Sequence, residues 1–230
     1  MFQLLLAIDT SGKNGSIALA RMMPGQSDVE VVEVVPLGGG AFSAQLVPQI
    51  AALLKQHGYS KRDLGAFAVV SGPGSFTGLR VGLAAIKALA EALQKPIVAV
   101  SLLEAVAASG TARGRVLAAL DAGRGDVYAG DYELDPGVLM NAHLHGERLL
   151  SREEFLAEAK SKLVVTPDAG LAEVVRLAGT PVEQIDYPNS GGIARLGWEH
   201  LQRGETVRAQ ELEANYIRHS DAEIFSKPAS

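Results

Sequence analysis

The sequence predicts an α/β protein with two lobes, each built on a mixed sheet. One design recurs half a chain apart, because residues 6–19 and residues 118–129 both read as an apolar strand, an Asp-led polar turn and a return strand. Each hairpin is followed by another strand, and then by helices that alternate with short strands. Polar residues and glycine interrupt the apolar pattern over residues 109–115. We therefore expect an N-terminal lobe at 1–110 and a C-terminal lobe at 111–230.

Composition narrows the class of protein. The chain has 230 residues, of which 47% are hydrophobic, and this is ample for a core without covalent staples. It contains no cysteine, which excludes disulfides and thiolate metal sites and favours a reducing cytosol. The N-terminus lacks a basic leader, and no apolar run approaches the length of a membrane span. We expect a soluble, cytoplasmic protein with no membrane contact.

The charge balance bears on partners. The chain carries 21 Lys and Arg against 26 Asp and Glu, for a net charge of -5. Affinity for nucleic acid depends largely on neutralised phosphates, so a mildly acidic chain without a dense basic block binds it poorly alone. Any RNA would have to be held mainly by another component.

Each predicted hairpin places an acidic residue at the start of its turn. Two Asp-bearing hairpins that face a nucleotide from both lobes are typical of actin-like ATPases, in which the two lobes arise by duplication. Asp is also simply a common turn residue after a strand. Residues 190–192 (SGG) are a weak adenosine motif and an equally good helix cap, so nucleotide binding is the less favoured interpretation. The candidate nucleotide or magnesium residues are Asp9, Thr10, Ser11 and Asp121.

A strand and a helix follow the first hairpin, at residues 29–35 and 43–56. In this helix three glutamines cluster on one side, and Leu46, Ile50 and other apolar residues cover the rest. Pro48 lies early in it, so the helix either starts late or bends there. The remaining predicted strands are residues 64–70, 97–100, 143–150 and 163–166.

The most informative segment is the glycine-dense turn at residues 71–82, SGPGSFTGLRVG. It joins a buried strand to a helix over 76–93, which Ser75 or Thr77 can cap. Such a turn suits a phosphate, but position 77 breaks the G-x-G-x-x-G spacing and no Lys-Ser or Lys-Thr pair completes a P-loop. We favour a tight connection in which the glycines let the helix lie close to the sheet.

The helix at 76–93 is apolar around most of its circumference. Its charged residues, Arg80, Lys87 and Glu91, fall on one narrow stripe. A helix on a sheet needs only one apolar face, so this one is either buried centrally in its own domain or covered by a partner. Two consecutive helices with surplus apolar surface favour the partner.

With these residues in place, the chain resembles the bacterial TsaB proteins, also called YeaZ. The resemblance rests on residues 5–11, 72–82, 95–101, 116–128 and 215–218 (NYIR), which span nearly the whole chain. The glycine segment is specific to this family and its close relatives. The resemblance implies the two-lobed actin-like fold, a duplication of a ribonuclease H-like unit.

The resemblance also implies a function. TsaB proteins are non-catalytic subunits of the machinery that attaches a threonylcarbamoyl group to N6 of adenosine 37, giving t6A in tRNAs that read ANN codons. TsaB pairs with the catalytic TsaD, the ATPase TsaE joins them, and TsaC supplies threonylcarbamoyl-adenylate. No cofactor is intrinsic, and ATP with magnesium is expected only weakly or at the level of the complex.

In this family the first two helices contact TsaD, or a second copy when TsaD is absent. We expect Leu46→Glu or Ala85→Glu to abolish pairing while the monomer stays folded. The implied interface residues are Leu46, Ile50, Leu53, Gly78, Arg80, Val81, Gly82, Ala85 and Leu89.

No active site is expected. TsaD-like proteins carry a metal-binding H-x-x-x-H after the strand that follows the glycine helix, and here Leu102 and Val106 stand at those places. Neither side chain has a lone pair for a metal. The glycine spacing around Ser75 does not form a nucleophile elbow. The histidines lie elsewhere, at positions 57, 143, 145, 200 and 219.

Two positions depart from the family pattern, and two other functions stay open. Phe42 stands where many relatives carry His, and Ala214 replaces a common Pro. The first alternative is an actin-like nucleotide-dependent kinase or ATPase that uses Asp9, Thr10 and Asp121. The second, a metallopeptidase, is disfavoured by the missing H-x-x-x-H.

Overall fold

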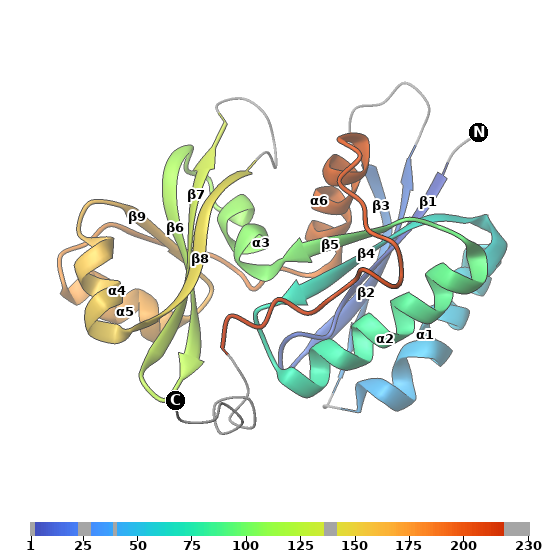
Figure 1. The fold of residues 1–230 in the computed structure, drawn as a ribbon, viewed down its shortest axis with the longest axis horizontal. Helices are drawn as coiled ribbons and strands as arrows, with labels where there is room; N and C mark the ends of the chain where they lie inside the picture. The colour runs from blue at the N-terminus through green and yellow to red at the C-terminus, as the bar shows by residue number, and fades with distance from the viewer. Residues whose placement is uncertain (1–2, 23–28, 39–40, 136–141, 219–230) are drawn as a thin grey trace, which may run out of the picture.

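The computed structural model describes residues 3–22, 29–38, 41–135 and 142–218, which form two lobes joined side by side (Figure 1). The first lobe contains a five-stranded sheet in the order β3-β2-β1-β4-β5. Strands β1, β2 and β3 are antiparallel neighbours, whereas β1, β4 and β5 run parallel. The strands are β1 Gln3–Asp9, β2 Gly15–Met22, β3 Val29–Leu37, β4 Leu64–Gly72 and β5 Ile97–Ser101.

The second sheet repeats this topology strand for strand. Its order is β10-β9-β6-β7-β8, with β6, β7 and β8 antiparallel and β6, β9 and β10 parallel. The predicted duplication and the two mixed sheets are therefore confirmed. The strands are β6 Gly114–Gly123, β7 Asp126–Leu134, β8 Ala142–Ser151, β9 Leu163–Thr166 and β10 Val182–Gln184.

Helices cover both sheets, and the last helix of each half packs on the sheet of the other half. Helices α1 and α2 lie against the first sheet, and α4 and α5 against the second. Helix α3 follows β5 but contacts β6 to β9, whereas α6 follows β10 and contacts β1 to β5. The helices are α1 Phe42–Gln56, α2 Phe76–Leu93, α3 Leu102–Ser109, α4 Arg152–Ala159, α5 Ala169–Leu177 and α6 Ser190–Gln202.

This exchange bears on the domain boundary. The strands of the two sheets lie on either side of residue 110, but α6 belongs to the later half and buries its apolar face on the first sheet. A chain cut at 110/111 would leave the first sheet without that cover. The division of the chain into separate lobes at residues 1–110 and 111–230 therefore stays a prediction.

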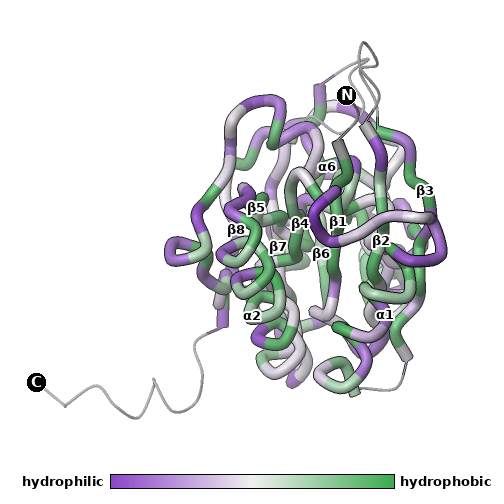
Figure 2. Tube along the Cα trace, turned by 90° about the vertical axis from the view of Figure 1, so that its right-hand side faces the viewer, coloured by the Kyte–Doolittle hydropathy of each residue, from purple (hydrophilic) through white to green (hydrophobic). Residues whose placement is uncertain are grey.

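The core sits along the central strands, where hydrophobic residues are concentrated in β1, β4 and β6 (Figure 2). Strand β4 is buried along nearly its whole length, as expected for a strand of a parallel sheet covered on both faces. Among the described residues, no helix combines the length and the apolar character needed to cross a membrane.

Local predictions were met at most elements. Helix α2 has the predicted bounds, and the Ser75 hydroxyl caps it by accepting the amide of Gly78 at 3.3 Å. Helix α1 begins at Phe42 and contains Pro48, so the late start is wrong. Pro48 lies in the second turn, where its missing amide leaves the carbonyl of Ala44 without an intrahelical donor.

Candidate functional site

The glycine turn brings the start of α2 against the end of β1. A Cβ added at Gly78 would lie 2.1 Å from the carbonyl oxygen of Thr10, and one at Gly82 would lie 2.5 Å from the Thr10 hydroxyl. The Thr10 hydroxyl in turn donates to the carbonyl of Gly78 at 2.7 Å. Only glycine permits this approach. The backbone that approaches Gly78 and Gly82 therefore belongs to this chain, and their place at a partner interface stays a prediction.

Two amides of the same turn are already bonded within the chain. The amide of Ser75 donates to the carbonyl of Ser11 at 2.6 Å, and the amide of Gly78 donates to the Ser75 hydroxyl. A Cβ at Gly74 would also lie 2.5 Å from the Ser11 carbonyl oxygen. The turn is a close-packed connection, as favoured from the sequence.

Three of the predicted interface residues on α1 are core residues of this chain. Leu46 is 1% exposed, and Ile50 and Leu53 are also buried in the first lobe. A carboxylate at position 46 would be buried without a partner, so Leu46→Glu would unfold the chain rather than leave a folded monomer. Burial makes a folded Leu46→Glu monomer an unfavourable expectation, whereas the place of Leu46 at a partner interface stays a prediction. The apolar pattern of α1 marked its buried face as well as its outer one.

The outer faces of α1 and α2 nevertheless form an apolar groove of 510 Å³. Val47 on α1 is 63% exposed and Phe76 on α2 is 41% exposed, and the half-buried Val81 and Ala85 lie between them. Exposed apolar surface that is continuous across two helices marks an interaction site. Leu89 is half-buried further along α2. The groove is lined by Ser43, Leu46, Val47, Phe76, Thr77, Arg80, Val81, Ala84 and Ala85.

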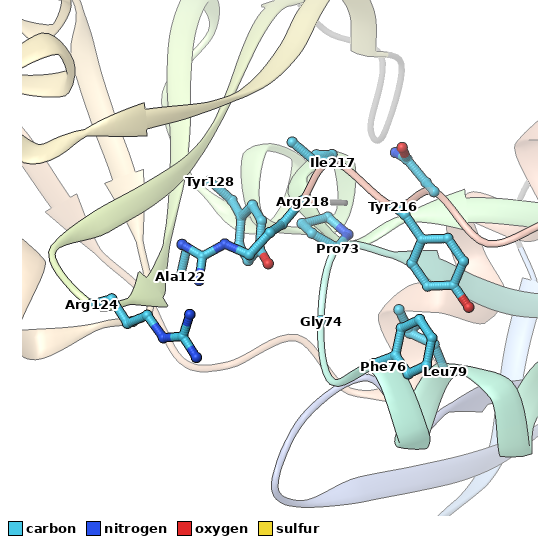
Figure 3. Close-up of a pocket in the computed structure, with 12 residues that line it drawn as sticks. Pro73, Gly74, Phe76, Leu79, Ala122, Arg124, Tyr128, Tyr216, Ile217 and Arg218 are labelled. Carbon is cyan, nitrogen blue, oxygen red and sulfur yellow. The ribbon is translucent and has the colours of Figure 1, made fainter. Parts of the chain in front are cut away.

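Arg80 lies on the rim of this groove. Its guanidinium carbon is 3.7 Å from the centroid of the Phe76 ring, a cation-π contact, and its Nε donates to the hydroxyl of Tyr216 at 3.1 Å. The rings of Phe76 and Tyr216 have centroids 5.1 Å apart (Figure 3). Arg80 is thus held by two uncharged aromatic side chains.

The second candidate region is the cleft between the lobes. Ser11 from the first hairpin and Asp121 from the second line one cavity of 490 Å³, together with Lys13, Asp168 and Tyr187. The structure therefore brings two of the predicted nucleotide residues together. Asp9 and Thr10 are buried behind the cavity wall, and neither lines it.

The Asp side chains of this region already serve the hairpins. Burial raises the pKa of Asp9, whose Oδ1 accepts the Ser11 amide at 2.8 Å and the Ser11 hydroxyl at 2.5 Å. Asp121 Oδ1 accepts the amide of Gly123 at 3.0 Å. The amide of Asp121 donates to Asp168 at 2.7 Å, and burial raises the pKa of Asp168. These contacts match the alternative interpretation of the sequence, in which each Asp stabilises the turn after its strand.

A neighbouring cavity of 340 Å³ lies between α2 and the second lobe, and Figure 3 shows its lining. Phe76 and Tyr216 line one side, whereas Tyr128, Arg124 and Arg218 reach it from the other. Arg218 is paired with Asp126 at 2.5 Å. This cavity adjoins both the cleft and the rim of the apolar groove.

The segment at residues 190–192 acts as a helix start. Asn189 caps α6 by accepting the amide of Gly191 at 2.9 Å, and the Ser190 hydroxyl donates to the carbonyl of Ser16 at 2.6 Å. A Cβ at Gly191 would lie 3.1 Å from Val34. These residues fasten α6 to β2 and β3 as its first turn, and the cap itself is Asn189, one residue before the predicted segment.

The positions of the H-x-x-x-H motif are in the core. Leu102 and Val106 lie in α3 and are buried. In the part of the chain that the structure describes, no group of three His, Cys, Asp or Glu side chains has the arrangement of a metal site. His143 and His145 are exposed on β8, and His57 and His200 pair with Glu33 and Glu104. His219 lies outside the described residues.

Phe42 and Ala214 have local structural roles. Phe42 is buried, and a Cβ at Gly15 would lie 2.9 Å from its ring, so it packs on the first hairpin. Ala214 packs against the main core. Both side chains are taken up by internal packing.

Sequence reasoning missed a hydrogen-bonded cluster that joins β5, β7, β8 and the segment after α6. Glu147 on β8 accepts the Tyr132 hydroxyl at 2.5 Å, the Asn215 side-chain amide at 2.7 Å and the Ser101 hydroxyl. These residues come from distant parts of the chain, and no spacing rule links them. The one sequence signal was the NYIR segment at 215–218, which served only for the resemblance.

Known proteins resemble this chain in both sequence and fold. Residues 36–179 match the model of a family described as TsaD, tRNA N6-adenosine threonylcarbamoyltransferase. The tRNA threonylcarbamoyladenosine biosynthesis protein TsaB of Escherichia coli is 29% identical over 234 residues, covering 95% of this chain and 96% of that protein. TsaB of Bacillus subtilis is 38% identical over 136 residues, which are 59% of this chain and 57% of that protein. The solved structure of YeaZ from Pseudomonas aeruginosa has a TM-score of 0.71 at 26% identity, with 92% of this chain and all of that chain covered.

The duplicated topology and the cleft between Asp-bearing hairpins define a two-lobed actin-like protein with ribonuclease H-like halves. The chain belongs to the TsaD family and, within it, to the TsaB (YeaZ) proteins.

Proposed function

We propose that this chain is a non-catalytic assembly subunit that pairs with a TsaD protein in threonylcarbamoylation of adenosine 37 N6 in tRNAs reading ANN codons. The observation that carries this proposal is the apolar groove between α1 and α2 in a TsaB-family chain. The TsaB relatives are named for tRNA threonylcarbamoyladenosine biosynthesis, which supports the same pathway here.

The occupant of the groove follows from shared ancestry. The family model spans 36–179, a range that includes both α1 and α2, so TsaD proteins carry a related helix pair. Related helix pairs can meet across a pseudo-two-fold contact in which each fills the groove of the other. A second copy of this chain would present the same surface, and we propose a homodimer when TsaD is absent. Specific pairing should bury at least about 1,000 Å².

The non-catalytic role rests on residue chemistry. Leu102 and Val106 occupy the positions at which TsaD-like proteins hold a metal, and both are packed in the core. Catalysis therefore belongs to TsaD in this proposal. The contribution of this chain is to bind the active arrangement of TsaD more tightly than other arrangements, which shifts the population toward it.

The remaining partners join at the level of the complex. A net charge of -5 gives tRNA little to bind on this chain alone, so we propose that tRNA is held through the complex. The ATPase TsaE is the proposed third component, and any ATP and magnesium would be bound with these partners.

Depletion of the chain in its host tests the pathway. The modified nucleoside should disappear from digested tRNA, as measured by mass spectrometry, and return with the parent chain but not with Val47→Glu. A matched control is Leu177→Glu, because Leu177 is 79% exposed on the equivalent helix pair of the second lobe. Retained modification after depletion would refute the assigned pathway.

The second candidate function is an actin-like nucleotide-dependent kinase or ATPase. The observation that favours it is the single cavity that Ser11 and Asp121 share. Calorimetry with ATP and magnesium separates the two functions, because a working site should bind in the micromolar range, about -8 kcal/mol. No heat of binding and no thermal protection by the nucleotide would eliminate it.

A further inference from the structure

The segment after α6 runs back across the first lobe and reaches the second (Figure 1). It pairs with β5 through a bridge between Ile97 and Val207, and it buries Leu212 in the core. It ends, within the described residues, at Arg218, which bonds to Asp126 of the second lobe. The segment is therefore tied to both lobes.

Asn215 is the central tie. Its backbone amide donates to the carbonyl of Ser71 at 2.8 Å, and its side chain donates to Glu147 at 2.7 Å. Gly72 has a φ of 142°, and a Cβ there would lie 2.5 Å from the carbonyl oxygen of Asn215. This close approach fixes the path of the backbone at Asn215. It therefore also fixes the position from which the side chain of the next residue, Tyr216, projects.

Tyr216 connects this tie to the groove. It stacks against Phe76 and accepts a hydrogen bond from Arg80, and both of these residues also line the groove. The hydroxyl of Tyr216 and the ring of Phe76 hold the guanidinium from two sides. Neither contact neutralises the positive charge, and no ion pair of Arg80 occurs among the described residues.

We propose that Tyr216 is a positioning residue that holds Arg80 at the rim of the apolar groove to receive a carboxylate from the partner. The inference rests on the proposed function, since the partner is the TsaD protein that fills the groove. An apolar groove alone accepts many helices. A fixed cation beside it adds register and selects a partner with an acidic side chain at the matching place.

Fixing Arg80 before binding raises affinity, because an arginine left free would lose side-chain entropy on docking. The neutral aromatic partners suit this role, since an intramolecular carboxylate would compete with that of the partner. The rigid fork of the guanidinium also matches a carboxylate better than a lysine does.

Titration calorimetry with the TsaD protein at low and high salt tests the inference. Arg80→Met should weaken binding about 10-fold at low salt and flatten the salt dependence, because it removes the cation. Tyr216→Phe keeps the ring but loses the hydrogen bond, and it should weaken binding about 3-fold. The double variant should be no weaker than Arg80→Met alone, since Tyr216 acts through Arg80.

The matched control is Arg208→Met. Arg208 lies on the same segment and pairs with the neighbouring Glu211, away from the groove. It removes the same charge and should leave affinity and salt dependence unchanged. Thermal unfolding of each variant separates a lost contact from a lost fold.

Two outcomes overturn the inference and differ from failure of the proposed function. If Arg80→Met binds with the parent's affinity and salt dependence, or if Arg208→Met matches its loss, Arg80 receives no partner carboxylate. If the double variant loses the product of the two single effects, Tyr216 acts independently of Arg80. If the parent chain itself does not bind TsaD, the proposed function fails first.

Discussion

Helices α1 and α2 on the first sheet and α4 and α5 on the second hold equivalent places in the two halves, but their outer surfaces have opposite chemistry. The first pair exposes Val47 and Phe76 beside a run of alanines. On the second pair α4 exposes Arg152, Glu153 and Glu154, and α5 exposes the ion pair of Glu173 and Arg176. One topology therefore supports one surface suited to a partner and one suited to water.

The difference teaches that the duplicated fold does not itself define the interaction site. Both helix pairs bury an apolar face on their own sheet, as the fold requires. The two helix pairs differ in the faces that point outward. Packing within the chain does not require these faces to be apolar. Surplus apolar surface on the helix pair is the signal, and Leu177 on α5 is an exposed apolar residue without such a surface around it.

The largest expected effect separates the inner face of α1 from its outer face. Leu46→Glu buries an unpaired carboxylate and should destabilise the fold by at least about 4 kcal/mol. Val47→Glu, one residue later, should change stability by less than about 1 kcal/mol. Urea unfolding followed by circular dichroism measures both. If Leu46→Glu unfolded cooperatively with the stability of the parent chain, the inner and outer faces of α1 would not differ as proposed.

The starts of α2 and α5 should respond differently to alanine. Gly78→Ala places a Cβ against the Thr10 carbonyl and should cost about 3 kcal/mol. Gly170, near the start of α5, has nothing within 4 Å of a Cβ, so Gly170→Ala should be neutral or stabilising by up to about 1 kcal/mol. Thermal and urea denaturation compare them. Equal effects would mean that the close approach at Gly78 relaxes freely.

The outer faces are compared by placing a charge on each. Val47→Glu should weaken pairing with TsaD about 100-fold, because a carboxylate would be buried in the groove without a partner. Leu177→Glu should leave pairing unchanged, since it adds the same charge at an exposed site on the other pair. Calorimetry and light scattering give the affinity and the size of the complex. If both variants lost pairing, the effect of Val47→Glu would not be specific to the groove, and the groove would not be the pairing site.

The ion pairs around the buried Asp131 of the second lobe should make the stability of the fold depend on pH. Burial would raise the pKa of Asp131, but hydrogen bonds from Arg115 and Lys162 outweigh it and lower the pKa to about 2. Because the folded pKa lies below the unfolded value of 3.8, the stabilisation is present above pH 3.8 and is lost as the pH falls toward about 2. It amounts to about 2 kcal/mol.

Asp131→Asn should therefore lose about 2 kcal/mol at pH 7 and little at low pH, relative to the parent. Urea unfolding at pH 7 and at about pH 2, where most of the stabilisation is lost, measures this difference. A loss that is the same at both pH values would show that packing, and not the ion pairs, accounts for the effect.

Much of the secondary structure was predictable because local patterns specify it. The hairpins follow from apolar strands and Asp-led polar turns, and α2 follows from Ser75 and the apolar run that ends at Leu93. The inner and outer faces of α1 were not distinguishable. Leu46 and Val47 are both apolar, and only the position of the first sheet decides which of them is buried.

The sequence by itself determined the duplicated α/β plan, the tight glycine turn and the surplus of apolar residues on two consecutive helices, because each depends on neighbours within a few residues. Only the tertiary structure decided that α3 and α6 change sheets, that Gly78 serves the contact with Thr10, and that Tyr216 reaches Arg80. These features join residues far apart in the chain. The physical reason is that their energy comes from burial and hydrogen bonds that exist only after the two lobes have packed together.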